Sequence, residues 1–169
     1  MANPLKVYVV EDDNMQGEMV KDHLSSKGYT VKLFSTGEAF LSSLENDKPE
    51  ILVLDYNLNS VNKSAMEGVD ILKRVKDRAS EIEVIMYSGQ DSIEVAVDTM
   101  RYGAFDYVVK GAAAFTRLEF IIGKIQKLWL TQENEAKYRK LNNWLIALIA
   151  AMFGAIIVGI ITGKIDLTK

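Results

Sequence analysis

The sequence contains no cysteine, and this absence removes several classes of site at once. Disulfide bonds, thiolate metal centres and cysteine nucleophiles are all excluded. Histidine occurs once, as His23, and its polar neighbours on a predicted helix favour a solvated residue without a catalytic role. Charge of one sign does not dominate either. The sequence has 20 Lys and Arg and 23 Asp and Glu, and the resulting net charge of -3 predicts no nucleic-acid partner.

Five short apolar segments alternate with helical patterns over the first two thirds of the chain. They lie at 7–10, 29–34, 51–54, 84–87 and 105–109. Gly28 and Gly103 stand where helices are expected to end, whereas Ser35 and Asp91, each three residues before a glutamate, are expected to cap helix starts. Because strand–helix–strand crossovers are right-handed, the alternation predicts a five-stranded parallel sheet with helices on both faces. This is a doubly wound α/β fold of the flavodoxin-like type.

Polar residues follow the carboxyl ends of four of these segments. They are Glu11 and Asp12 after the first, Asp55 after the third, Ser88 after the fourth and Lys110 after the fifth. In an open α/β sheet such residues meet at the edge where ligands bind. Clustered carboxylates repel one another unless a cation is present, and oxygen ligands suit Mg²⁺. Since a lysine and a hydroxyl can bind phosphoryl oxygens, the pattern predicts phosphoryl transfer to a carboxylate.

The same segments resemble the signature blocks of a known family, the receiver domains of bacterial response regulators (CheY-like). The blocks are Val9–Asp13, Leu52–Asp55, Met86–Gly89 and Asp106–Lys110, within a resemblance that covers about Leu5–Gln126. The resemblance implies a Mg²⁺-dependent aspartyl phosphate on Asp55. The phosphoryl group would come from a phosphohistidine on a sensor histidine kinase or a histidine phosphotransfer protein.

The resemblance also implies a metal site. Glu11 and Asp12 resemble the family's metal-binding acid pair, with Asp12 as the more direct ligand. Asp55 and the backbone carbonyl of Asn57 complete the expected protein ligands. Asp13 is given no role. The loop after Asp55, residues 58–66, is longer than is usual in the family and has no proline.

Three further residues receive roles from the resemblance. Ser88 and Lys110 match the residues that contact the phosphoryl group, and Tyr107 resembles the aromatic switch residue. The family often has a proline after the lysine, in a cis bond, but here Gly111 follows. A non-proline cis bond costs about 2.5–4 kcal/mol, so Lys110 is expected to be oriented in another way.

The C-terminal third has a different pattern, and it divides the chain into four parts. A receiver domain is expected at 1–127, a charged helical linker at 128–143, a transmembrane helix at 144–163 and a short tail at 164–169. The segment 144–163 holds no charged residue, and about 20 apolar residues span a bilayer core of roughly 30 Å. Basic residues before it place the receiver in the cytoplasm of a single-pass inner-membrane protein. Small residues at every fourth position suggest a homodimer or a membrane-protein partner.

The leading hypothesis is therefore a membrane-anchored receiver that switches partner binding in phosphorelay signal transduction. It is not expected to be an enzyme beyond promoting its own aspartyl phosphorylation and dephosphorylation. One alternative is a pseudo-receiver that acts as a membrane docking platform without phosphorylation. Another is a hydrolase of small phosphomonoesters, which is disfavoured because such enzymes need a second acid two residues after the nucleophile, where Asn57 stands here.

Overall fold

The computed structural model describes residues 4–58 and 65–161, with side chains up to residue 154. The strands in these ranges are β1 (Lys6–Val10), β2 (Thr30–Phe34), β3 (Ile51–Asp55), β4 (Glu83–Ser88) and β5 (Asp106–Val109). The helices are α1 (Asn14–Ser26), α2 (Gly37–Ser43), α3 (Gly68–Arg78), α4 (Ile93–Arg101) and α5 (Ala114–Ile161).

The strands form one parallel sheet in the order β2-β1-β3-β4-β5. The central strand β3 is buried along its whole length. Its run of apolar residues follows from this position, because a parallel strand covered on both faces meets no water on either side. The predicted five-stranded parallel α/β fold is confirmed.

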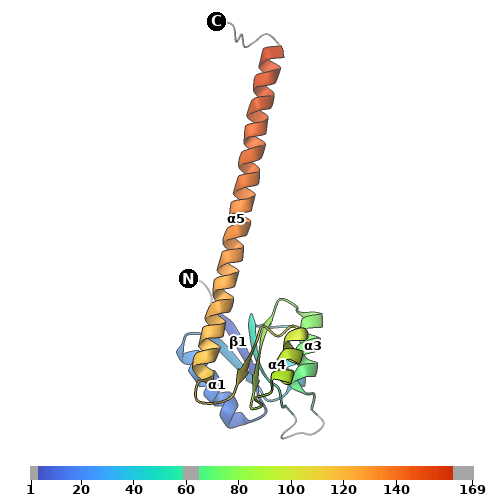
Figure 1. Ribbon diagram of the computed structural model, residues 1–169, viewed down its shortest axis with the longest axis vertical. Helices are drawn as coiled ribbons and strands as arrows, with labels where there is room; N and C mark the ends of the chain where they lie inside the picture. The colour runs from blue at the N-terminus through green and yellow to red at the C-terminus, as the bar shows by residue number, and fades with distance from the viewer. Residues whose placement is uncertain (1–3, 59–64, 162–169) are drawn as a thin grey trace. The chain divides into compact units, whose positions relative to one another are not determined.

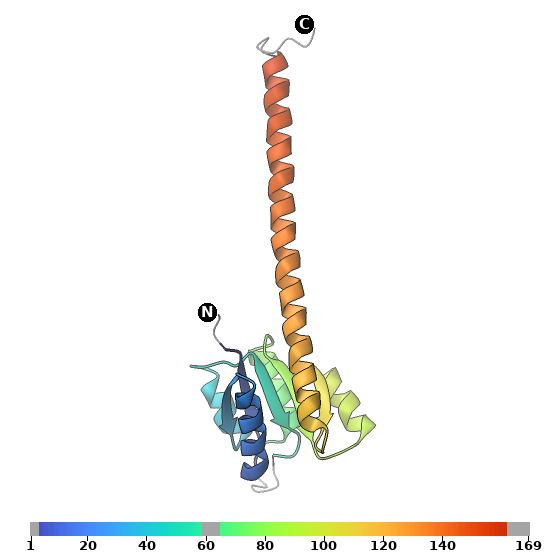
Figure 2. The same cartoon turned by 90° about the vertical axis from the view of Figure 1, so that its left-hand side faces the viewer.

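Helices cover both faces of the sheet (Figures 1 and 2). On one face, Phe40 of α2 and Leu72 of α3 pack in a single core cluster with Leu52 and Leu54 of β3. On the other face lie α1 and the first turns of α5, and these two helices contribute further buried apolar side chains. They are Val20 and Leu24 from α1 and Leu118, Ile121 and Ile122 from α5.

A polar and aromatic contact joins α1 to the first turns of α5. The His23 ring stacks on Phe115 with 4.7 Å between the ring centroids, and its Nε2 lies 2.7 Å from Glu119 Oε1. Lys27 Nζ lies 3.1 Å from the same oxygen. The expectation of a merely solvated His23 is therefore wrong, because α5 supplies partners that lie 92 and 96 residues away in the sequence.

The starts of α2 and α4 follow the predicted chemistry with a shift of one residue, whereas Gly28 and Gly103 follow the ends of α1 and α4 as expected. Thr36 and Ser92 cap α2 and α4, and their side chains accept hydrogen bonds from the backbone N–H groups of Ala39 and Val95. The expected caps Ser35 and Asp91 each stand one position too early. A cap must have extended backbone angles and an oxygen that reaches back to the third residue of the helix, which local composition alone does not locate to one residue.

The chain divides into two compact units, residues 1–124 and 125–169. The second unit contains the rest of α5 as far as residue 161. Its described side chains include exposed apolar residues such as Leu141 and Trp144. They also include an ion pair between Glu133 and Lys137, 2.8 Å apart and one helical turn from each other.

The predicted transmembrane helix is not supported. No helix within residues 4–58 and 65–161 is long and apolar enough to cross a membrane. Residues 162 and 163 of the expected segment lie outside the described residues. The expected placement as a single-pass inner-membrane protein is wrong on this finding.

Gly68 starts α3 directly against the backbone at the end of β3. A β-carbon at this position would lie 2.1 Å from the Asp55 carbonyl oxygen and 2.8 Å from Tyr56 Cα. The Gly68 N–H also donates to the Tyr56 carbonyl at 3.0 Å. Only a residue without a side chain lets α3 begin this close to the strand that carries Asp55.

We expect Gly68→Ala to lower the free energy of unfolding by about 1–3 kcal/mol, because the backbone must shift to admit the methyl group. Denaturant unfolding measures the change. The matched control is Gly123→Ala in α5, where a β-carbon meets nothing within 4 Å. This control should be neutral or stabilising by up to about 1 kcal/mol. Equal stability of the Gly68 variant and the native chain would contradict the close approach.

Asp47, in the loop before β3, joins β1 to β2 through contacts with side chains of both strands. Its carboxylate lies 2.5 Å from Lys32 Nζ and 2.6 Å from Lys6 Nζ, and it accepts a hydrogen bond from the buried Tyr8 hydroxyl. Hydrogen bonds from Lys32, Lys6 and Tyr8 hold the pKa of Asp47 well below its usual range. The carboxylate is therefore ionised across the neutral range.

We expect Asp47→Asn to lower the melting temperature at neutral pH, because Tyr8 and both lysines lose a charged acceptor. The folded pKa lies below the unfolded value, so the stabilisation is present above about pH 4 and is lost as the pH falls further. Thermal unfolding at a series of pH values should show a gap between the two proteins that narrows below about pH 4. A gap of constant size would contradict this account.

Candidate functional site

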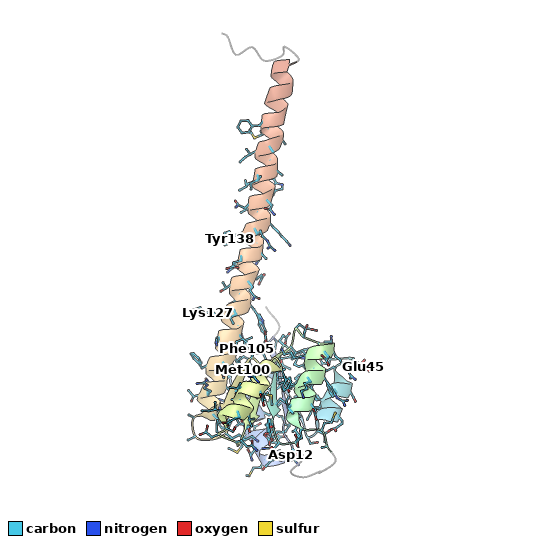
Figure 3. The ribbon with its side chains drawn as sticks, turned by 45° about the vertical axis from the view of Figure 1, so that its right-hand side comes forward. Asp12, Glu45, Met100, Phe105, Lys127 and Tyr138 are labelled. Atoms are coloured by element: carbon cyan, nitrogen blue, oxygen red, sulfur yellow. The ribbon has the colours of Figure 1, made fainter. Side chains whose placement is uncertain are left out.

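The predicted site residues come together where β1, β3, β4 and β5 end. Glu11 and Asp12 follow β1, and Figure 3 shows Asp12 at this end of the sheet. Asp55 is the last residue of β3, Ser88 is the last residue of β4, and Lys110 follows β5. The strands are parallel, so their carboxyl ends meet at one edge. Buried apolar strands thus bring together polar groups that are distant in the sequence.

Lys110 is the cation of the site. Its Nζ lies 3.0 Å and 2.7 Å from the two carboxylate oxygens of Glu11 and 3.1 Å from Asp55 Oδ2. Its backbone N–H donates to the Ser88 carbonyl at 2.7 Å. None of the peptide bonds in the described ranges is cis, including the one before Gly111. Strand pairing and two carboxylates therefore orient Lys110 where the family often uses a proline.

Burial decides the protonation of the two acids that Lys110 contacts. It raises the pKa of Glu11 to about 7, with Asp55 adding to the rise and Lys110 opposing it. Burial also raises the pKa of Asp55, again against the effect of Lys110. Burial alone would lower the pKa of Lys110, but the two carboxylates outweigh it and raise that pKa. Lys110 is thus charged, and a second cation would stabilise both acids in their ionised forms.

Three of these acids could hold a metal ion. Glu11, Asp12 and Asp55 each offer a carboxylate oxygen, and the three oxygens lie within 4.8 Å of one another. Within the described part of the chain, Glu11 Oε2 is a buried oxygen that receives no hydrogen bond, although Lys110 Nζ is close to it. An all-oxygen set with a spare buried acceptor suits a hard cation such as Mg²⁺. The backbone N–H of Asn57 donates a hydrogen bond to Asp55 Oδ1, with 3.3 Å between the two atoms.

Ser88 and Tyr107 are both hydrogen-bonded to Gln90, in the loop that follows β4. Ser88 is fully buried, and its Oγ accepts a hydrogen bond from the backbone N–H of Gln90 at 3.1 Å. The Tyr107 hydroxyl donates to the carbonyl of the same Gln90 at 2.9 Å, while its ring packs against the core cluster. A movement of Ser88 would therefore displace Gln90 and alter the hydrogen bond between the Gln90 carbonyl and the Tyr107 hydroxyl.

Sequence reasoning missed two residues around the site. Asp13 caps α1, since its Oδ1 accepts hydrogen bonds from Met15 N at 2.9 Å and Gln16 N at 3.1 Å. An acid directly before a helical pattern is a known cap signal, so Asp13 could have been found. Tyr87 lies under Lys110, with 5.2 Å from Nζ to the ring centroid. No local sequence pattern predicts that contact, because Tyr87 belongs to β4 and Lys110 follows β5.

We expect Glu11 to make stability depend on pH when divalent metal is removed. Its folded pKa of about 7 exceeds the unfolded value of about 4.3, so its contribution is favourable below the unfolded pKa and is lost as the pH rises through about 7. Denaturant unfolding in EDTA should show that the free energy of unfolding of wild type falls, relative to that of Glu11→Gln, by on the order of 2 kcal/mol as the pH rises across this range.

Glu81→Gln is the control for this measurement. Glu81 is exposed, and its pKa is lowered by backbone and Lys48 hydrogen bonds. The stability difference between wild type and Glu81→Gln should therefore stay constant over the same pH range. A Glu11 difference that is equally constant would mean that the buried carboxyl is not protonated more tightly in the folded chain.

Comparison with known proteins supports the interpretation of this edge. Residues 7–119 match the family described as the response regulator receiver domain. Response regulator MprA of Mycolicibacterium vanbaalenii is 26% identical over 125 residues, which cover 74% of this chain and 50% of MprA. Transcriptional regulatory protein FixJ of Bradyrhizobium diazoefficiens is 30% identical over 104 residues, which cover 62% of this chain and 48% of FixJ. The chain thus matches about half the length of these relatives.

A solved structure shares the fold as well. The CheY-like receiver domain protein of Methanospirillum hungatei JF-1 matches with a TM-score of 0.65 at 26% identity, covering 73% of this chain and 95% of that one. The family match contains all four strand ends that form the site, from Glu11 to Lys110. The chain belongs to the response regulator receiver domain family.

Proposed function

We propose that the chain accepts a phosphoryl group on Asp55 from a phosphohistidine of a sensor histidine kinase or a histidine phosphotransfer protein. The observation that carries the proposal is the contact of a buried aspartate with a partly buried lysine, with 3.1 Å between Asp55 Oδ2 and Lys110 Nζ. A carboxylate oxygen of Asp55 attacks phosphorus, the bond from phosphorus to the histidine nitrogen breaks, and an acyl phosphate forms. Membership of the receiver family supports this chemistry.

The residues around Asp55 have separate tasks in this proposal. Glu11, Asp12, Asp55 and the carbonyl of Asn57 hold Mg²⁺, which neutralises phosphoryl charge when bound. Lys110 binds one phosphoryl oxygen through its ammonium group, which already lies beside Asp55. In this proposal the chain promotes only its own phosphorylation and dephosphorylation.

The output of the switch passes through Ser88 and Tyr107. The Ser88 hydroxyl moves to donate a hydrogen bond to a phosphoryl oxygen, and its present bond with Gln90 N is then replaced. Because Gln90 also binds the Tyr107 hydroxyl, this movement alters the position of Tyr107 and the surface around β5. A changed surface there would switch partner binding.

The identity of the partner is a separate matter. The balanced charge predicts no nucleic-acid partner, and this stays a prediction. FixJ is named a transcriptional regulatory protein, but the match covers only 48% of its length. Its activity as a whole protein is therefore no guide to what this receiver binds.

We expect the purified chain to become labelled when incubated with Mg²⁺ and radiolabelled phosphoramidate, whose P–N bond resembles that of phosphohistidine. The label should be stable in acid and labile in base, as an acyl phosphate is. Asp55→Asn and addition of EDTA should each reduce it to background. Asp98→Asn, which changes an exposed acid of α4, is the control and should keep full labelling. Absence of label on the native chain, or undiminished label on Asp55→Asn, would overturn the proposal.

A further inference from the structure

We propose that Tyr87 is a positioning residue that holds the Lys110 ammonium group against its ring, so that the group stays beside Asp55. The inference rests on the proposed function, and it assigns a role to a residue outside the signature set of acids, serine, lysine and aromatic switch. Tyr87 would act through Lys110 and would not touch the phosphoryl group itself.

The fold places the Tyr87 ring beside the Lys110 ammonium group. Tyr87 is the penultimate residue of β4 and stands opposite Asp55 in the register of the sheet. Its carbonyl accepts a hydrogen bond from Tyr56 N at 3.3 Å, and its side chain is buried. The centroid of the ring lies 5.2 Å from Lys110 Nζ, within the roughly 6 Å at which a cation is attracted to an aromatic face.

The ring supplies an attraction of a different kind from that of the two carboxylates. Glu11 lies closer to Lys110 Nζ than Asp55 does, at 2.7 Å against 3.1 Å. With the carboxylates alone, the ammonium group is drawn toward Glu11. The negative face of the Tyr87 ring attracts the same charge without accepting one of its directed N–H bonds. Lys110 can therefore keep its place while its N–H groups turn to a phosphoryl oxygen.

Support from the other side of Lys110 is slight. Gly111 follows it, and a β-carbon on Gly111 would meet nothing within 4 Å. Gly111 itself therefore supplies no side chain that could hold the lysine in place. The Tyr87 ring and the two carboxylates all lie within reach of the Lys110 ammonium.

The test compares variants at residue 87 that separate ring electrostatics from packing. Tyr87→Phe keeps the negative ring face, whereas replacement by pentafluorophenylalanine keeps the size and apolar character but reverses the charge distribution of the ring. Tyr87→Leu removes the ring altogether. We expect Phe to be phosphorylated at the native rate. The pentafluoro and Leu variants should be phosphorylated about threefold to tenfold more slowly, at unchanged phosphoramidate KM.

Phe105→Leu is the matched control, because Lys124 Nζ lies at the same 5.2 Å from the Phe105 ring. Phe105 precedes β5 and so lies at the opposite end of the sheet from Asp12 (Figure 3). This variant loses an equivalent cation–ring contact and should be phosphorylated at the native rate. The pentafluoro comparison decides the matter even if Tyr87→Leu does not fold, since thermal unfolding can verify that the fluorinated chain is intact.

A second readout separates this inference from the proposed function. The NMR signal of the Lys110 ammonium group is measured in the unphosphorylated chain, where it should shift in the pentafluoro variant and stay in place with Phe. If no variant is phosphorylated but the signal shifts in this way, the proposed function fails and the positioning by Tyr87 stands. If all residue-87 variants are phosphorylated at the native rate with an unmoved signal, Tyr87 does not position Lys110.

Discussion

One ammonium group between two buried carboxylates is the interaction on which the rest of the site depends. Glu11 and Asp55 are almost fully buried, and like charges so close together cannot both ionise cheaply. Lys110 contacts both and makes their burial tolerable. Because one cation cannot fully neutralise two carboxylates and the neighbouring Asp12, the edge retains an excess of negative charge. That excess favours binding of a further cation, and with it the chemistry of a phosphoryl group.

The parallel sheet explains how three such distant residues meet. Each belongs to or follows a different strand, and the strands end together because helical crossover connections run every strand in the same direction. Two further contacts stabilise the strands that carry the site. Gly68 lets α3 begin against the backbone of Asp55, and Asp47 joins β1 to β2 through Lys6 and Lys32. Stability of the frame and geometry of the site are therefore linked through β1 and β3.

Much of the fold and site was predictable because their patterns are local. Apolar runs that end on acids, on Ser88 or on Lys110 mark the strand ends, and a parallel sheet then brings them together. The position of Tyr87 under Lys110 was not predictable, because it depends on a register between strands. The partners of His23 were missed because they lie on α5, far from His23 in the sequence. The transmembrane interpretation was drawn from the uncharged run 144–163 and is not supported, because no helix of the described residues is long and apolar enough to cross a membrane.

The central claim is that Asp55 is the one acid at this edge that accepts a phosphoryl group. Borohydride reduction of the labelled chain converts an aspartyl phosphate to homoserine, and peptide mass spectrometry then locates the converted residue. The account predicts conversion at Asp55 and none at Glu11 or Asp12, although all three carboxylates lie within 4.8 Å of one another. Conversion at Glu11 or Asp12, or at none of the three, would contradict it.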